Sequence, residues 1–124
     1  SMKTTWVALL ALLSLSALQA LAAPHAVAGI DITTRSRVQY TCDGGKTVTA
    51  SYLNARNGQG FAVLRVKGKT MLFVDTLSAS GARYVAGHYV WWTRGPGATL
   101  YDEMTGENAP PMLANCRSRT LLQR

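Results

Sequence analysis

Ser80 and Arg94 are the residues whose types and spacing are best suited to chemistry in this sequence. They flank Gly87 and His88, which can form a two-residue turn, with glycine first, between two antiparallel strands. In that register Gly81 lies opposite Arg94, so the Ser80 hydroxyl and the Arg94 guanidinium come side by side at one end of the hairpin. A hydroxyl can donate or accept a hydrogen bond, and a guanidinium binds carboxylates through charge-assisted hydrogen bonds. The pair can therefore contact carboxyl groups.

The same register predicts which other side chains face each other across the hairpin: Ala86 and Tyr89, Tyr84 and Trp91, Arg83 and Trp92. We expect one face of the hairpin to be core and the other to be exposed. Tyr84 and Trp91 would form a cross-strand aromatic pair on the first face, and Arg83 would lie over Trp92 on the second.

Each of these residues also has an ordinary structural interpretation. A serine before glycine, as at Ser80, is typical of a turn, and Arg94 before glycine is typical of a solvated strand end. Trp91 is typical of a core residue. Only their combination, together with a family resemblance described below, favours a functional interpretation.

The sequence carries little that could support catalysis or cofactor binding. Asp102 and Glu103 are adjacent in a predicted strand and would point to opposite faces, whereas acid–base catalysis needs convergent carboxylates. No serine lies in a nucleophile elbow, and a hydrolytic triad would have to use His25 or His88. The Gly-Lys-Thr tripeptides at 45–47 and 68–70 lack the earlier glycine of a phosphate-binding loop. We therefore predict a protein that is not an enzyme and has no cofactor.

The elements that must position these residues are predicted to be strands. Runs rich in Val, Tyr, Thr, Phe and Trp alternate with glycine and asparagine clusters, which is typical of an antiparallel all-β domain, either a small barrel or a sandwich. The predicted strands are 37–42, 46–53, 61–66, 70–76, 83–87, 89–94, 98–103 and 113–118.

The first residues of the chain are typical of a secretory signal peptide. Lys3 precedes an apolar run over 6–18, and the small-x-small sequence at 20–22 predicts cleavage after Ala22. The run is shorter than the roughly 20 residues that a membrane-spanning helix needs. No cysteine follows it for lipid attachment. We expect export to the periplasm without a membrane anchor in the mature chain, and we interpret Ser1 as a cloning remnant.

Length and charge limit the rest of the protein. The 124 residues allow one domain, and 13 basic against 6 acidic residues give a net charge of +7. We predict a signal peptide over 1–22, a mobile lead-in over 23–36 and a single β-domain over 37–124, which forms a monomer or a weak dimer.

Cys42 and Cys116 are the only cysteines, and they lie near the two ends of the patterned region. Because export places them where disulfides persist, we expect them to form one disulfide. The rival interpretations are a metal pair and a reactive thiol. His25 and His88 are not at ligand spacing from the cysteines, so we expect no metal site.

The hairpin and its surroundings resemble the exported bacterial inhibitors of c-type lysozyme, a family with membrane-bound and periplasmic members. The matching residues are Ser80-Gly81-Ala82-Arg83-Tyr84, then Trp92-Thr93-Arg94-Gly95 with Ala98 and Leu100, and the frame of Tyr40, Cys42 and Cys116. The resemblance implies an eight-stranded antiparallel β-barrel with one disulfide. It also implies that the two hairpin segments bind c-type lysozyme, with Ser80 and Arg94 entering the cleft and engaging its two catalytic carboxyl groups.

The sequence departs from the family in two respects. Many members carry lysine where this chain has Arg94, and arginine keeps the charge but adds a planar fork. The net charge of about +6 that remains without Lys3 also matches in sign that of most animal lysozymes of this type, so long-range attraction is not expected.

A different function class is compatible with the same composition. A basic barrel that carries Tyr84, Tyr89, Trp91 and Trp92 could bind single-stranded nucleic acid or an anionic glycan by stacking and charge. Export argues against nucleic acid. The alternative function is therefore a basic envelope protein that binds an anionic glycan or lipopolysaccharide, and a purely structural envelope protein is a third interpretation.

Overall fold

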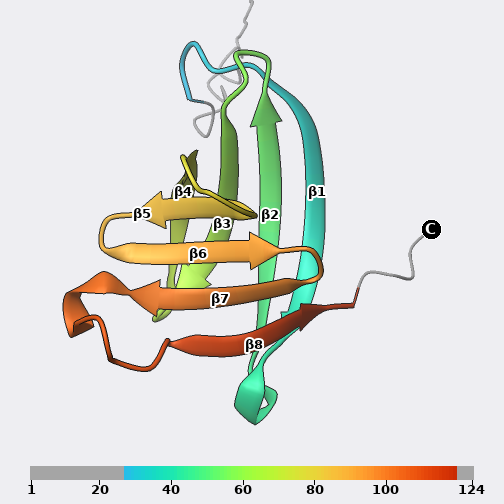
Figure 1. Ribbon diagram of the computed structural model, residues 1–124. Coiled ribbons are helices and arrows are strands. Elements are labelled where there is room, and N and C mark those ends of the chain that lie inside the picture. Colours follow the sequence, from blue (N-terminus) through green and yellow to red (C-terminus); the bar gives the residue numbers. More distant parts are fainter. Residues whose placement is uncertain (1–26, 120–124) are drawn as a thin grey trace, which may run out of the picture.

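Eight β-prone runs separated by tight turns form the protein, of which the computed structural model describes residues 27–119. The strands are β1 (Ile32–Thr41), β2 (Thr47–Ala55), β3 (Gly60–Val66), β4 (Lys69–Thr76), β5 (Ala82–Ala86), β6 (Tyr89–Arg94), β7 (Gly97–Asp102) and β8 (Leu113–Ser118). Short 3-10 helices follow β1 (η2, Asp43–Gly45) and β7 (η3, Glu103–Thr105). Each strand pairs with the next and β8 returns to β1, which confirms the predicted all-β antiparallel barrel. In Figure 1 the long strands β1–β3 stand upright while β5–β8 lie across them.

The predicted strand bounds hold to within two residues, except at the first strand. β1 begins at Ile32 instead of 37, so residues 32–36, which were expected in the lead-in, pair with β2. Four of these five positions are exposed, so they lack the alternation of apolar and polar residues that marks a half-buried strand. The strand extends to Ile32 because these residues pair with β2, and this pairing leaves no pattern in the local sequence.

The expected signal peptide, 1–22, lies outside the described residues. Within 27–119 there is no helix long and apolar enough to cross a membrane. In the same range, no group of three or more His, Cys, Asp and Glu side chains is arranged to hold a metal ion.

The barrel interior is packed around Trp91 and Phe73, whose exposed fractions are both 0%. Trp91 meets the Tyr40 ring edge-on, with centroids 5.1 Å apart. Its indole Nε1 donates to the Tyr52 hydroxyl at 2.9 Å, and that hydroxyl lies 2.7 Å from the Tyr40 hydroxyl. This chain of hydrogen bonds satisfies polar groups that the core would otherwise leave unpaired.

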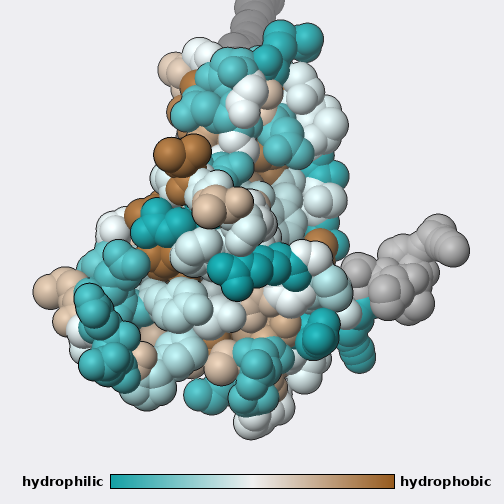
Figure 2. Space-filling view, viewed as in Figure 1, coloured by the Kyte–Doolittle hydropathy of each residue, from teal (hydrophilic) through white to brown (hydrophobic). Residues whose placement is uncertain are grey.

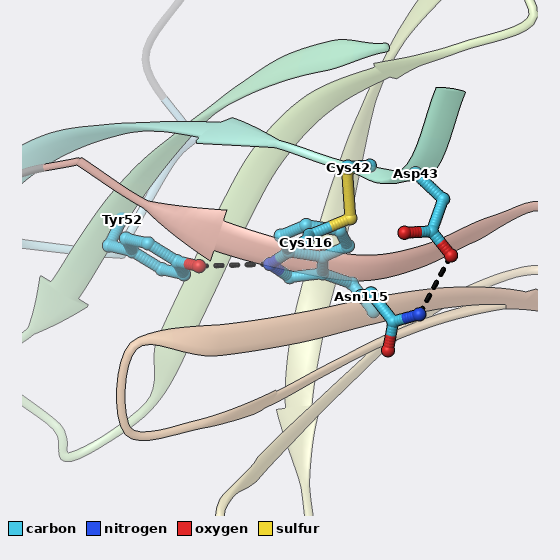
Figure 3. The surroundings of a disulfide bond; sticks show 6 residues. Cys42, Asp43, Tyr52, Asn115 and Cys116 are labelled. Carbon is cyan, nitrogen blue, oxygen red and sulfur yellow. Dashed lines mark hydrogen bonds between the residues drawn. A yellow bond between two sulfur atoms is a disulfide. The ribbon is translucent and has the colours of Figure 1, made fainter. Parts of the chain in front are cut away.

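The expected disulfide is present between Cys42 and Cys116, which are 74 residues apart in the sequence (Figure 3). It joins the residue after β1 to the middle of β8 and so lies at the closure of the barrel. Next to it, Asn115 Nδ2 donates to Asp43 Oδ2 at 2.7 Å, which ties β8 to η2.

Candidate functional site

The candidate site is built on the β5–β6 hairpin, whose predicted register is confirmed from Ala82 opposite Thr93 to Ala86 opposite Tyr89. Arg83 lies opposite Trp92, and Tyr84 lies opposite Trp91. The turn uses Gly87 with φ of 59°, a left-handed conformation that favours glycine. A two-residue turn of this kind fixes the pairing of every following residue, so it determines which side chains reach the same end of the hairpin.

The two faces of the hairpin divide as expected, but the aromatic contacts differ. Tyr84 and Trp91 share the inner face. Each nevertheless makes a ring contact with another strand: Trp91 meets Tyr40, and the Tyr84 ring centroid lies 5.6 Å from that of Tyr52. The barrel is closed, so inward-pointing rings meet side chains from β1 and β2 as well as those next to them. Desolvation raises the pKa of the half-buried Tyr84, which therefore keeps its proton at neutral pH.

On the outer face, the Trp92 ring connects the two predicted contact segments. Its Nε1 donates to the Ser80 carbonyl oxygen at 2.9 Å. The Arg94 guanidinium carbon lies 4.9 Å from the ring centroid and that of Arg83 lies 5.9 Å away, both within cation–π range. The predicted contact of Arg83 with Trp92 is confirmed. The closer contact of Arg94 with the same ring was not predicted, although residues two apart on one strand share a face.

Gly81 brings the loop 78–81, here called the serine loop, against the end of β6. A Cβ at this position would stand 2.2 Å from the Thr93 carbonyl oxygen and 2.7 Å from Arg94 Cγ, and its φ is 67°. Ser78 Oγ also donates to the Gly81 carbonyl oxygen at 3.1 Å. Only glycine fits such a close approach. The loop is therefore held beside Arg94 by backbone contact as well as by Trp92.

The two arginines of the site differ in how much they are already bound. Arg83 donates to Thr76 Oγ1 at 3.2 Å and lies 3.6 Å from Glu103 Oε2, with 27% of its side chain exposed. Arg94 is exposed, and it has no ion-pair partner in the part of the chain that the structure describes. Of the two arginines, Arg94 is thus the one whose charge has no ion-pair partner within residues 27–119.

The remaining predicted residues lie in the same region. Ala82 pairs with Thr93, and Gly95 begins the β6–β7 turn. Leu77, which directly precedes Ser78 and has 95% of its surface exposed, is not among the predicted site residues. A single leucine in a loop has no periodic pattern to mark it, so only the structure reveals that it is exposed next to the site.

Comparisons with known proteins identify a family and several relatives to which this chain is similar. Residues 40–109 match the family described as the membrane-bound lysozyme-inhibitor of c-type lysozyme. The membrane-bound lysozyme inhibitor of C-type lysozyme of Cupriavidus necator is 47% identical over 110 residues, which cover 85% of this chain and 87% of that protein. The protein of the same name in Pseudomonas aeruginosa is 42% identical over 89 residues, covering 71% of this chain and 68% of that protein.

Two solved structures are also similar. One is Pseudomonas aeruginosa MliC in complex with hen egg white lysozyme, with a TM-score of 0.59 and 31% identity; the match covers 94% of this chain and all (100%) of that one. The other is PliC, the periplasmic lysozyme inhibitor of C-type lysozyme from Salmonella typhimurium, with a TM-score of 0.61 and 25% identity, covering 70% of this chain and 100% of that one.

Proposed function

Because this chain belongs to the family of membrane-bound inhibitors of c-type lysozyme, we propose that it inhibits a c-type lysozyme by binding it, and that it catalyses no reaction itself. The observation that carries the proposal is the Trp92 ring, which holds the Ser80 loop and the Arg94 guanidinium at one end of a rigid hairpin. In the proposal, this end of the hairpin enters the lysozyme cleft.

The chemistry of the pair matches that of the cleft. Lysozyme cleaves with one carboxylic acid of raised pKa and one ionised carboxylate. The Ser80 hydroxyl can accept a hydrogen bond from the acid or donate one to the carboxylate. The Arg94 guanidinium would neutralise the carboxylate through charge-assisted hydrogen bonds, with a planar fork in place of the lysine that is common in the family.

The electrostatic match is local and does not extend to the whole molecule. The net charge, +7 for the whole chain and about +6 without Lys3, gives no long-range attraction to a basic lysozyme. Binding must therefore come from short-range contacts in which charged groups lose water on both sides. Such contacts mainly affect the dissociation rate, because the partner's carboxylate is left buried and unpaired when the arginine is removed.

Arg94→Ala and Ser80→Ala test the proposal. We expect Arg94→Ala to weaken inhibition of hen egg white lysozyme at least tenfold, because truncating a buried charged contact costs about 2 to 5 kcal/mol of binding. Ser80→Ala should have a smaller effect and Arg94→Lys the smallest. The measurement is the inhibition constant in a cell-wall lysis assay, with Lys69→Ala on β4 as a control that also removes one positive charge. Unchanged inhibition by both Arg94→Ala and Ser80→Ala would refute this site.

We also propose that the protein acts in the periplasm after cleavage of residues 1–22. The inhibitory domain is then 37–124 together with residues 32–36, the first part of β1. The charged start, short apolar run and Ala22 support this layout. The mass of the protein recovered from a periplasmic extract should equal that of a chain beginning at Ala23. A mass that includes an attached lipid, or an uncleaved chain, would contradict it.

A further inference from the structure

A row of three residues crosses the outer face of β6, β7 and β8 beside the proposed site. Arg94 lies opposite Gly97, and Gly97 lies opposite Arg117. Side chains of directly opposed residues in antiparallel strands stand on the same face. Because neighbouring strands are about 5 Å apart, the two arginine backbones are separated by roughly 10 Å, with only the Gly97 backbone between them.

This row forms the floor and walls of a groove of about 390 Å³, lined by Arg94, Gly97, Thr99, Asn115 and Arg117 among others. Gly97 does not have a left-handed backbone, and a Cβ there would make ordinary contacts of 3.5 Å and 3.7 Å with two carbonyl oxygens. The backbone therefore does not require glycine at this position. What the missing side chain does is leave the groove open between the two guanidinium groups.

The charge of the groove is not neutralised from within. Neither Arg94 nor Arg117 has an ion-pair partner among residues 27–119. The nearby carboxylate of Asp43 accepts a hydrogen bond from Asn115 at 2.7 Å. In Figure 2, the face that carries β5–β8 shows hydrophilic side chains around its centre. Two exposed guanidinium groups on either side of an open floor form a site for an anion.

We propose that this groove is a second contact site for the lysozyme, in which Arg117 binds a carboxylate at the rim of the cleft while Arg94 reaches the catalytic carboxylate. This inference rests on the proposed function. A protein carboxylate fits better than an anionic glycan, because the Trp92 ring beside the groove is already covered by the guanidinium groups of Arg94 and Arg83, which hinders stacking on a sugar.

Arg117→Ala, Arg117→Glu and Gly97→Val test the groove. We expect the inhibition constant against hen egg white lysozyme to rise three- to tenfold for Arg117→Ala and further for Arg117→Glu, which would repel a carboxylate. Gly97→Val fills the floor and should weaken inhibition at least tenfold. Lys69→Ala is the control for loss of one charge, and thermal unfolding of each variant checks that the barrel is intact. The Arg117 variants do not depend on the valine being accommodated.

The outcomes separate this inference from the proposed function. If Arg94→Ala weakens inhibition but folded Arg117→Glu and Arg117→Ala do not, the groove proposal is overturned and the inhibitory site remains. If the Arg117 variants inhibit normally but lose binding to purified lipopolysaccharide, the groove serves an anionic glycan and the proposal is again wrong. Unchanged inhibition by Arg94→Ala and Ser80→Ala would overturn the proposed inhibitory site, whereas the absence of inhibition by the unsubstituted protein would overturn the function itself.

Discussion

At the residue scale, Trp92 organises the site through two different parts of one side chain. Its N–H holds the Ser80 carbonyl, and its ring face carries the Arg94 guanidinium. Both interactions order groups that would otherwise lose conformational entropy on binding. Trp92 is therefore a positioning residue for the proposed contact, and its substitution should affect inhibition more than folding.

Trp92→Phe separates the two parts. The phenyl ring can still lie under Arg94, but the hydrogen bond to the Ser80 carbonyl is lost, so we expect inhibition to weaken about threefold to tenfold. Trp92→Leu removes both interactions and should weaken it more. Inhibition constants are compared for Trp92→Phe, Ser80→Ala and the double variant. If Trp92 acts through Ser80, the fold-loss of inhibition in the double variant is smaller than the product of the two single fold-losses. A full product of the two effects would contradict the positioning role.

Tyr52 is the central residue of the buried hydrogen-bond chain. Tyr52→Phe would leave the Trp91 N–H and the Tyr40 hydroxyl without this shared partner, so we expect the free energy of unfolding to fall by about 1 to 3 kcal/mol. Burial raises the pKa of Tyr52, so the hydroxyl stays protonated at neutral pH. Urea unfolding measures the effect, with the more exposed Tyr101→Phe as the control. Equal free energies of unfolding for Tyr52→Phe and Tyr101→Phe would show that this series of hydrogen bonds contributes nothing to stability.

At the element scale, the β5–β6 turn is joined to η3 by polar contacts. His88 Nδ1 lies 2.6 Å from Asp102 Oδ1, which also accepts from the Met104 N–H at 3.0 Å. The Glu103 N–H donates to the His88 carbonyl oxygen at 2.8 Å. These contacts secure the end of the hairpin that lies away from Ser80 and Arg94, so the site is carried on a hairpin fastened at both ends.

The Asp102 carboxylate makes this junction sensitive to acid. Its pKa is lowered from the ordinary value of 3.8, first by the Met104 N–H and then by His88. Because the folded pKa lies below the unfolded one, the carboxylate stabilises the fold at higher pH, and this contribution is lost as the pH falls through the two pKa values. We expect the unfolding free energy to decrease below about pH 5, and Asp102→Asn to reduce that decrease. Identical pH profiles for the two proteins would refute this assignment.

At the scale of the whole molecule, the β1–β8 pairing that closes the barrel is the shortest of its strand pairings. Within the described residues, β1 pairs with β8 at Tyr40 with Ser118 and at Thr41 with Arg117, and the Arg119 N–H also donates to the Gln39 carbonyl oxygen at 3.1 Å. By contrast, β1 pairs with β2 along most of its length. The Cys42–Cys116 disulfide lies directly beside this short seam. It therefore fastens β8, the strand that carries Arg117, to the rest of the barrel.

Replacing both cysteines by alanine tests the role of the disulfide. Closing a loop of this length should stabilise the fold by roughly 4 to 5 kcal/mol in the chain-entropy model, so the variant should unfold at much lower urea concentration. Loss of the disulfide should accelerate amide hydrogen exchange more in β8 than in the β5–β6 hairpin. An equal acceleration of exchange in the two elements would contradict the view that the disulfide protects the β1–β8 pairing.

Local sequence was sufficient for the hairpin and for the covalent frame. Gly87 and His88 form the predicted turn, and a turn of two residues sets a register that then repeats with period two, so Arg83 was correctly placed opposite Trp92. The two cysteines had only each other to pair with. These predictions succeed because each depends on neighbours in sequence or on a single possible partner.

Tertiary structure alone decided the contacts between strands that are distant in sequence. The early start of β1 depends on pairing with β2, and the ring contacts of Tyr84 and Trp91 depend on side chains from the opposite wall. The row of Arg94, Gly97 and Arg117 exists only because β7 brings β6 and β8 into one register. Alternation along a strand determines which face a side chain takes, but the stagger at which the barrel closes determines what stands beside it.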